Sequence, residues 1–117
     1  DTGAHSVQTI TPIGKFHPYW LYRMEGDRII KDVENNVYRR QDLPPKYAID
    51  SAVGVVRFEV LMAAEGSGDP HAFWGVDRRG IVQQAEETVD IDAFRDLYLA
   101  EAVLREKQGL GARVYTL

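Results

Sequence analysis

Two aspartates separated by one residue, Asp90 and Asp92, stand in the stretch T-V-D-I-D-A-F-R-D, directly before a predicted helix. If residues 89–92 end a strand, side chains alternate between its faces, so the two carboxylates share one face with Cα atoms roughly 6.5–7 Å apart. Ligands of open α/β sheets bind beyond the carboxyl ends of strands. Mg²⁺ takes one or two protein carboxylates together with substrate phosphates, so the pair predicts a magnesium site.

Helix capping is the alternative explanation of the same pattern. Aspartate is a favoured N-cap residue, so Asp92 is predicted to begin the helix and Asp90 can simply be exposed. Two aspartates at this spacing occur in many proteins for that reason alone. The pattern therefore needs support from elsewhere in the chain.

A second polar group stands at Arg39, Arg40 and Gln41, in the stretch Y-R-R-Q-D-L-P-P-K. Arginine can bind a carboxylate through two parallel hydrogen bonds, and glutamine can hydrogen-bond sugar hydroxyls. The alternative is a solvated loop that ends in a rigid pair of prolines. On its own, the stretch is compatible with both.

The elements that must position these groups follow from periodicity and turn residues. The strand over residues 48–58 has little alternation after Ser51, which suggests burial on both faces. The last helix carries an apolar stripe at three- and four-residue steps, with Asp96 near the positive end of its dipole. The predicted elements are a strand over 6–13, a hairpin over 19–31, a loop over 32–46, the strand over 48–58, a short helix over 58–65, an R-R-G turn within 71–82, a strand ending at 89–92, and a helix over 92–108.

The composition of the 117 residues excludes several classes of protein. Apolar residues make up 44% and charged residues 27%, as in ordinary globular domains. The net charge of −4 argues against a general nucleic-acid-binding surface, and the chain has no cysteine for disulfides or thiolate zinc sites. No apolar run reaches the length of a membrane span, and the first residues lack the features of a signal peptide. We expect a cytoplasmic protein with no nucleic-acid or membrane partner.

Taken together, R-R-Q-D-L-P-P-K-Y and V-D-I-D-A-F-R-D-L-Y-L-A-E resemble the second half of the acylneuraminate cytidylyltransferases, the CMP-sialic acid synthetase family. H-P-Y-W-L-Y-R at 17–23 is similar to the segment that enters that family's dimerisation hairpin. The resemblance covers about residues 6–106.

The resemblance implies an α/β fold that is part of a three-layer, Rossmann-like α/β/α nucleotidyltransferase sandwich with a projecting hairpin. The 117 residues would form the C-terminal portion of one domain, with a dimerisation and substrate segment at about 15–46 and the sheet and C-terminal helix at 47–117. The implied reaction is Mg²⁺-dependent transfer of CMP from CTP to a nonulosonic acid. Asp92 and Asp90 would hold the metal, and Arg39, Arg40, Gln41 and Asp50 would contact the sugar.

Two departures from the family's pattern qualify these expectations. An Asn-Gly pair usually precedes the alanine of the long strand in the family, whereas this chain has Asp50-Ser51. An ionised aspartate cannot donate a hydrogen bond as asparagine does. The basic, glycine-containing loop that grips CTP phosphates is not found in the chain, which we expect to be a homodimer that needs an N-terminal half. The alternative is a non-catalytic oligomerisation or binding module that keeps the fold.

Overall fold

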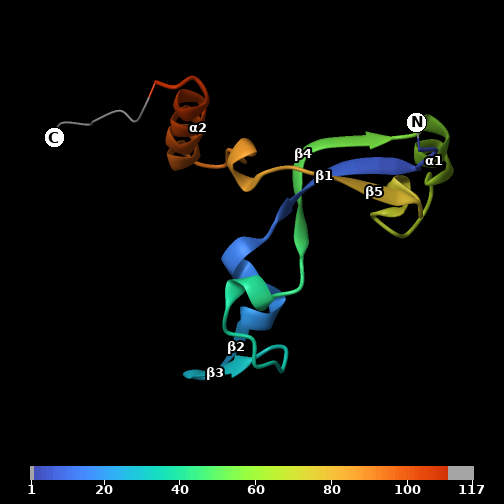
Figure 1. Ribbon diagram of the computed structural model, residues 1–117. Coiled ribbons are helices and arrows are strands. Elements are labelled where there is room, and N and C mark those ends of the chain that lie inside the picture. The colour runs from blue at the N-terminus through green and yellow to red at the C-terminus, as the bar shows by residue number, and fades with distance from the viewer. Residues whose placement is uncertain (1, 111–117) are drawn as a thin grey trace.

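The computed structural model describes residues 2–110 and shows a mixed α/β arrangement (Figure 1). A three-stranded sheet has the order β4-β1-β5, and a separate two-stranded sheet pairs β2 with β3. The α/β class predicted from the sequence is confirmed. The elements are β1 (Ser6–Pro12), β2 (Tyr22–Glu25), β3 (Arg28–Lys31), β4 (Tyr47–Val56), α1 (Phe58–Ala63), β5 (Arg78–Val82) and α2 (Phe94–Lys107).

The central strand β1 pairs antiparallel with β4 and parallel with β5. Residues 6–10 of β1 lie opposite residues 78–82, so the R-R-G stretch is part of a strand and its prediction as a turn is wrong. The absence of a side chain at Gly80 allows residues 78–82 to pair with β1. A Cβ on Gly80 would lie 2.7 Å from Cδ1 of Ile10, so a residue without a side chain fits beneath that isoleucine.

A β-bulge interrupts the pairing of β1 with β4. Gln8 pairs with Gly54, but Ile10, two residues further along β1, pairs with Ile49, five residues back along β4. Residues 50–53 of β4 therefore loop out opposite the single residue Thr9. Bulges of this kind re-aim side chains next to functional sites.

The predicted hairpin is confirmed as β2 and β3, joined by a turn with Gly26 at φ 64°. It begins later than predicted, because residues 18–20 form a 3₁₀ turn. Met24 pairs with Ile29 across the two strands, and directly paired residues share a face of the sheet. Both side chains are largely exposed, at 63% and 66%.

The connection before α2 differs from its prediction. Residues 88–91 have no strand assignment, so the predicted strand ending at Asp92 is wrong: in the described chain β1 already pairs with β4 on one side and β5 on the other. The N-cap of α2 is Ala93 instead of Asp92. Asp96 lies in the first turn, as predicted, and its Oδ2 accepts hydrogen bonds from the backbone N–H groups of Asp92 (2.9 Å) and Ala93 (2.7 Å).

The described residues contain no buried apolar side chain, and the four buried residues, Ser6, Gln8, Thr9 and His17, are all polar. The prediction that β4 is buried on both faces is wrong for this structure, since eight of its ten residues are exposed. The chain exposes 9617 Å², whereas a compact monomer of its 13.3 kDa exposes roughly 6,400 Å². The radius of gyration is 19.1 Å, against about 13 Å for a compact domain of this length.

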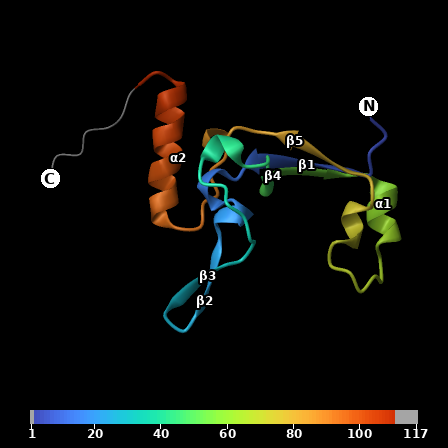
Figure 2. The same ribbon diagram turned by 60° about the horizontal axis from the view of Figure 1, so that its bottom comes forward.

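The arrangement in space explains this exposure. In Figure 1 the hairpin extends away from the three-stranded sheet, and α2 stands apart from it at the opposite side from α1. Figure 2, turned by 60°, shows the same separation of α2 and α1. Neither helix covers a face of the sheet in either view. The sheet faces are therefore available to further polypeptide.

Candidate functional site

The bulge in β4 is built around the carboxylate of Asp50. Oδ1 of Asp50 accepts hydrogen bonds from the Thr9 hydroxyl and from the backbone N–H of Ala52 (3.0 Å). Oδ2 accepts one from the side-chain amide of Gln83, 3.2 Å away, just beyond β5. The Thr9 hydroxyl in turn accepts from the backbone N–H of Val53 at 3.0 Å. One carboxylate thus connects β4, β1 and the end of β5, and we call this group the Asp50 clasp.

The hydrogen bonds of the clasp favour the ionised form of Asp50. The Thr9 hydroxyl is the main cause that lowers the pKa of this carboxyl below its ordinary value. Partial desolvation opposes this shift, and smaller contributions from the Ala52 and Gln83 hydrogen bonds add to it. Hydrogen bonds donated to a carboxylate stabilise its charged state. Asp50 therefore carries a negative charge at neutral pH.

Ser51 follows Asp50 at the tip of the bulge and adopts φ 61°, the left-handed region. Among the described residues it is the one non-glycine residue with positive φ. This conformation crowds the Cβ atom of an L-residue against the backbone and is strained. Its side chain is exposed.

The predicted sugar contacts Arg40 and Gln41 lie in a 3₁₀ turn, Arg40–Asp42, a few residues before β4. Arg39 precedes the turn, and its Nε is 2.9 Å from Oδ2 of Asp42. All three predicted side chains are exposed. Arg39 is thus engaged by its own loop, whereas Arg40 borders a hollow.

This hollow has a volume of about 220 Å³ and lies at the start of β4. Arg40 and Lys46 give its wall two positive charges, and His17 lies in it as well. His17 is fully hydrogen-bonded: Nδ1 accepts from the N–H of Tyr19 at 3.1 Å, so the ring proton is on Nε2, which donates to the carbonyl of Pro44 at 2.8 Å. His17 is 2% exposed and joins the hairpin entry to the Pro-Pro loop, which is a structural role.

The predicted metal ligands Asp90 and Asp92 lie in the connection to α2, and both are exposed. Over residues 2–110, no group of three or more histidine, aspartate or glutamate side chains is placed to hold a metal ion. Two carboxylates nevertheless fit the hard oxygen ligands that Mg²⁺ prefers, because substrate phosphates and water complete its shell.

The structure brings some of the predicted site residues together and separates others. Arg40 and Asp50 belong to one continuous segment, the turn that leads into β4 and the bulge within β4. In Figure 1 this turn lies on the hairpin side of the sheet, whereas α2 and the connection before it lie apart. The turn that carries Arg40 and the connection that carries Asp90 and Asp92 therefore lie apart in the described chain.

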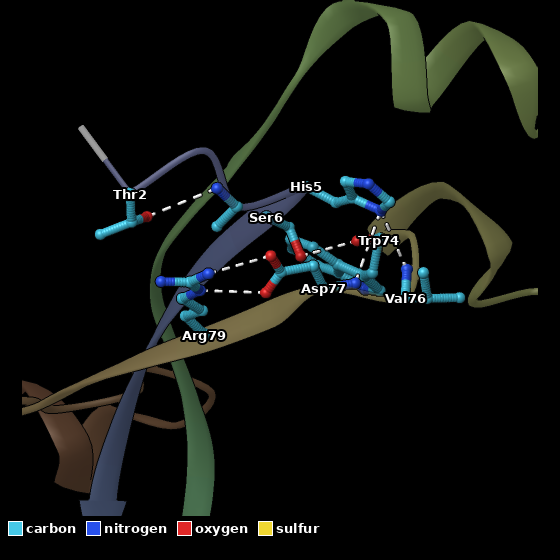
Figure 3. Close-up of polar contacts among 8 residues, drawn as sticks. Thr2, His5, Ser6, Trp74, Val76, Asp77 and Arg79 are labelled. Carbon is cyan, nitrogen blue, oxygen red and sulfur yellow. Dashed lines mark hydrogen bonds and ion pairs between the residues drawn. The ribbon is translucent and has the colours of Figure 1, made fainter.

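A third cluster was not predicted from the sequence, and Figure 3 shows it. Nδ1 of His5 accepts hydrogen bonds from the backbone N–H groups of Val76 (3.2 Å) and Asp77 (3.4 Å). Asp77 also forms a two-bond ion pair with Arg79, 3.0 Å at each contact, which lowers the pKa of the Asp77 carboxyl. The Ser6 hydroxyl donates to the carbonyl of Trp74 at 2.7 Å.

The sequence contains one local signal for this cluster. Asp77 and Arg79 are two residues apart, so they share a face once the segment is a strand. Nothing in the sequence connects them to His5, which is 71 positions from Val76. Beside His5 lies a largely apolar hollow of about 380 Å³. It is bordered by small residues at the end of α1, at its C-cap and in the 72–76 turn, namely Ala63, Ala64, Ala72 and Gly75.

None of the described helices combines the length and the apolar character needed to cross a membrane. Comparison with models of known protein families gives no match, and comparison with curated protein sequences gives none either.

Proposed function

We propose that this chain supplies sugar and metal contacts of a cytidylyltransferase that transfers CMP from CTP to a nonulosonic acid. The observation that carries the proposal is the left-handed backbone of Ser51, φ 61°. Ser51 stands where the cytidylyltransferases that the chain resembles carry the glycine of their Asn-Gly pair. A glycine is the residue that a left-handed position requires, so the backbone supports an alignment made from sequence motifs alone.

The proposal extends to the architecture. The chain exposes about 3,200 Å² more surface than a compact monomer of its mass, which is enough to bury against a covering segment. It supports a larger three-layer sandwich in which an N-terminal half covers the sheet and contributes the CTP phosphate loop. The exposed Met24–Ile29 face of the hairpin supports a role in homodimerisation.

Each side chain then has a chemical role. Arg40, with Lys46 beside it, would bind the carboxylate of the acid sugar, because both line the cationic hollow at the start of β4. Asp92 and Asp90 would hold Mg²⁺. A magnesium ion bound there supplies positive charge to the phosphate oxygens, on which negative charge develops during attack by the sugar hydroxyl.

The test is pyrophosphate release by the full-length protein with CTP, Mg²⁺ and a panel of sialic, legionaminic and pseudaminic acids. We expect release with at least one acid and a fall in kcat of about 100- to 1000-fold in Asp92→Asn, by analogy with the loss of other groups that stabilise transition-state charge. Asp27→Asn, an equal change of charge in the hairpin turn, should leave the rate unchanged. Absence of release with every acid contradicts the proposal.

A non-catalytic binding module is the second candidate, and the Asp50 clasp favours it. Both carboxylate oxygens of Asp50 are engaged within the chain, where the related enzymes carry an asparagine that can donate. Binding of the acid sugar by the full-length protein without pyrophosphate release would support this candidate.

A further inference from the structure

The Asp50 carboxylate is directed into the sheet. Its two oxygens accept from the Thr9 hydroxyl, the Ala52 amide and the Gln83 side chain. An ionised carboxylate only accepts hydrogen bonds, so Asp50 cannot supply a donor to a ligand. The negative charge also disfavours the approach of another carboxylate.

Ser51, the next residue, has the opposite properties. Its side chain is exposed, and its hydroxyl can both donate and accept. Its backbone is held in the left-handed region, where a glycine would be free of strain. Strained non-glycine residues persist where the surrounding structure fixes them, and they cluster at sites that bind ligands. Here the clasp supplies that fixation, since it anchors the residues on both sides of Ser51.

We propose that the Ser51 hydroxyl is the hydrogen-bonding group that the bulge presents to the acid sugar, and that Asp50 is a positioning residue which holds the bulge in place. This inference rests on the proposed function, and it assigns the two residues separate roles. Ser51 would meet a hydroxyl or amide of the sugar. The sugar carboxylate would lie toward Arg40 and Lys46, away from the negative charge of Asp50.

The orientation is consistent with the spacing along β4. Tyr47 borders the cationic hollow, and Ser51 follows four residues later. Strand residues rise about 3.3 Å each, so the two positions are separated by up to about 13 Å, less the contraction at the bulge. The cationic hollow and Ser51 are therefore neighbours along one strand, with the carboxylate end of the sugar at the hollow and its hydroxyl tail toward Ser51.

The test separates stability from affinity in the full-length protein. Ser51→Gly should raise the midpoint of urea unfolding, because the strain is removed, and raise KM for the acid sugar by about three- to tenfold, the loss of one neutral hydrogen bond. KM for CTP should stay unchanged. Ser51→Ala should raise KM for the sugar similarly without raising the unfolding midpoint. Ser67→Gly, at an exposed serine in the loop after α1, is the matched control and should leave both KM values unchanged. An unchanged sugar KM in both Ser51 variants overturns the assignment.

The role of Asp50 is measured without substrate, by hydrogen exchange at the Ala52 and Val53 amides. Asp50→Ala should accelerate exchange at both, whereas Asp50→Asn keeps an Oδ1 acceptor and should remain close to the unchanged protein. A higher sugar KM in Asp50→Ala with unchanged amide exchange would assign Asp50 a direct sugar contact and overturn its positioning role. If the unchanged protein releases no pyrophosphate with any acid, the proposed function and the role of Ser51 fail together, while the exchange rates still decide the role of Asp50.

Discussion

Thr9 and Asp50 are 41 positions apart in the sequence, yet their side chains share a hydrogen bond of 2.5 Å across the bulge between β1 and β4. The same hydroxyl accepts from the Val53 amide, so Thr9 fixes both ends of the looped-out segment. One buried threonine thereby fixes the backbone path of residues 50–53, which include Ser51, the residue proposed to contact the sugar.

Thr9→Val is expected to lower the free energy of unfolding at neutral pH, because it keeps the side-chain shape and removes the hydroxyl. Since the folded pKa of Asp50 is lowered, its ionised form contributes stability above the unfolded pKa of about 3.9, and this contribution is lost as the pH falls through the folded pKa. The stability difference between the unchanged protein and Thr9→Val should therefore be constant above about pH 5 and narrow below about pH 4. Urea unfolding across this pH range measures it.

Thr11→Val, on the same strand, serves as the control for this prediction. Its stability difference from the unchanged protein should show no such narrowing. If the stability difference between the unchanged protein and Thr9→Val is independent of pH down to pH 2, Thr9 stabilises the fold only through its hydrogen bond with the Val53 amide.

Gly75→Ala is expected to destabilise the protein by about 2–4 kcal/mol, from a left-handed backbone and an overfilled contact together. Gly75 has φ 72°, and a Cβ there would lie 2.6 Å from Nδ1 of His5 and 2.9 Å from a methyl of Val60. Gly66→Ala is the matched control. Its φ is 78°, but nothing lies within 4 Å of its Cβ position, so backbone strain alone should cost about 1 kcal/mol. Equal losses of stability in the two variants would mean that the His5 side chain moves aside for the added methyl group at no cost in free energy.

His5→Leu removes the acceptor shared by the Val76 and Asp77 amides. We expect a loss of about 1 kcal/mol in stability and faster hydrogen exchange at these two amides. His5→Asn places an oxygen near the position of Nδ1 and should restore part of the protection. His71→Leu, at an exposed histidine, should change neither quantity. Unchanged exchange at Val76 in His5→Leu would contradict the role given to His5.

The hairpin prediction concerns self-association. Met24→Lys and Ile29→Lys each place a charge on the exposed apolar face. If the protein forms the proposed homodimer through this face, both changes should shift it toward monomer in sedimentation velocity. A desolvated charge at the centre of an apolar interface is expected to weaken association by tenfold or more. Asp27→Lys adds positive charge at the turn and should leave the dimer intact. A dimer unaffected by all three changes would place the dimer contact elsewhere.

Local patterns in the sequence determined the elements whose hydrogen bonds are local or whose turns carry a clear signal. The alternation and the Gly26 turn predicted the hairpin, the run with little alternation over residues 48–58 predicted β4, and the three- and four-residue steps predicted α2. These features depend on side-chain period and backbone preference, which neighbouring residues carry.

Tertiary structure alone decided which segments pair and where the polar side chains are directed. Arg78, Arg79 and Gly80 read as a turn, but β1 offers them a parallel edge and makes them a strand. The connection at Asp90 and Asp92 reads as a strand, but β1 pairs with β4 and β5, and the connection has no strand assignment. Asp50 reads as a ligand contact, yet Thr9 and Gln83 hold it inside the sheet. Each of these strand pairings and side-chain contacts depends on a partner dozens of residues away in the sequence. The spacing of apolar residues within one segment carries no information about such a partner.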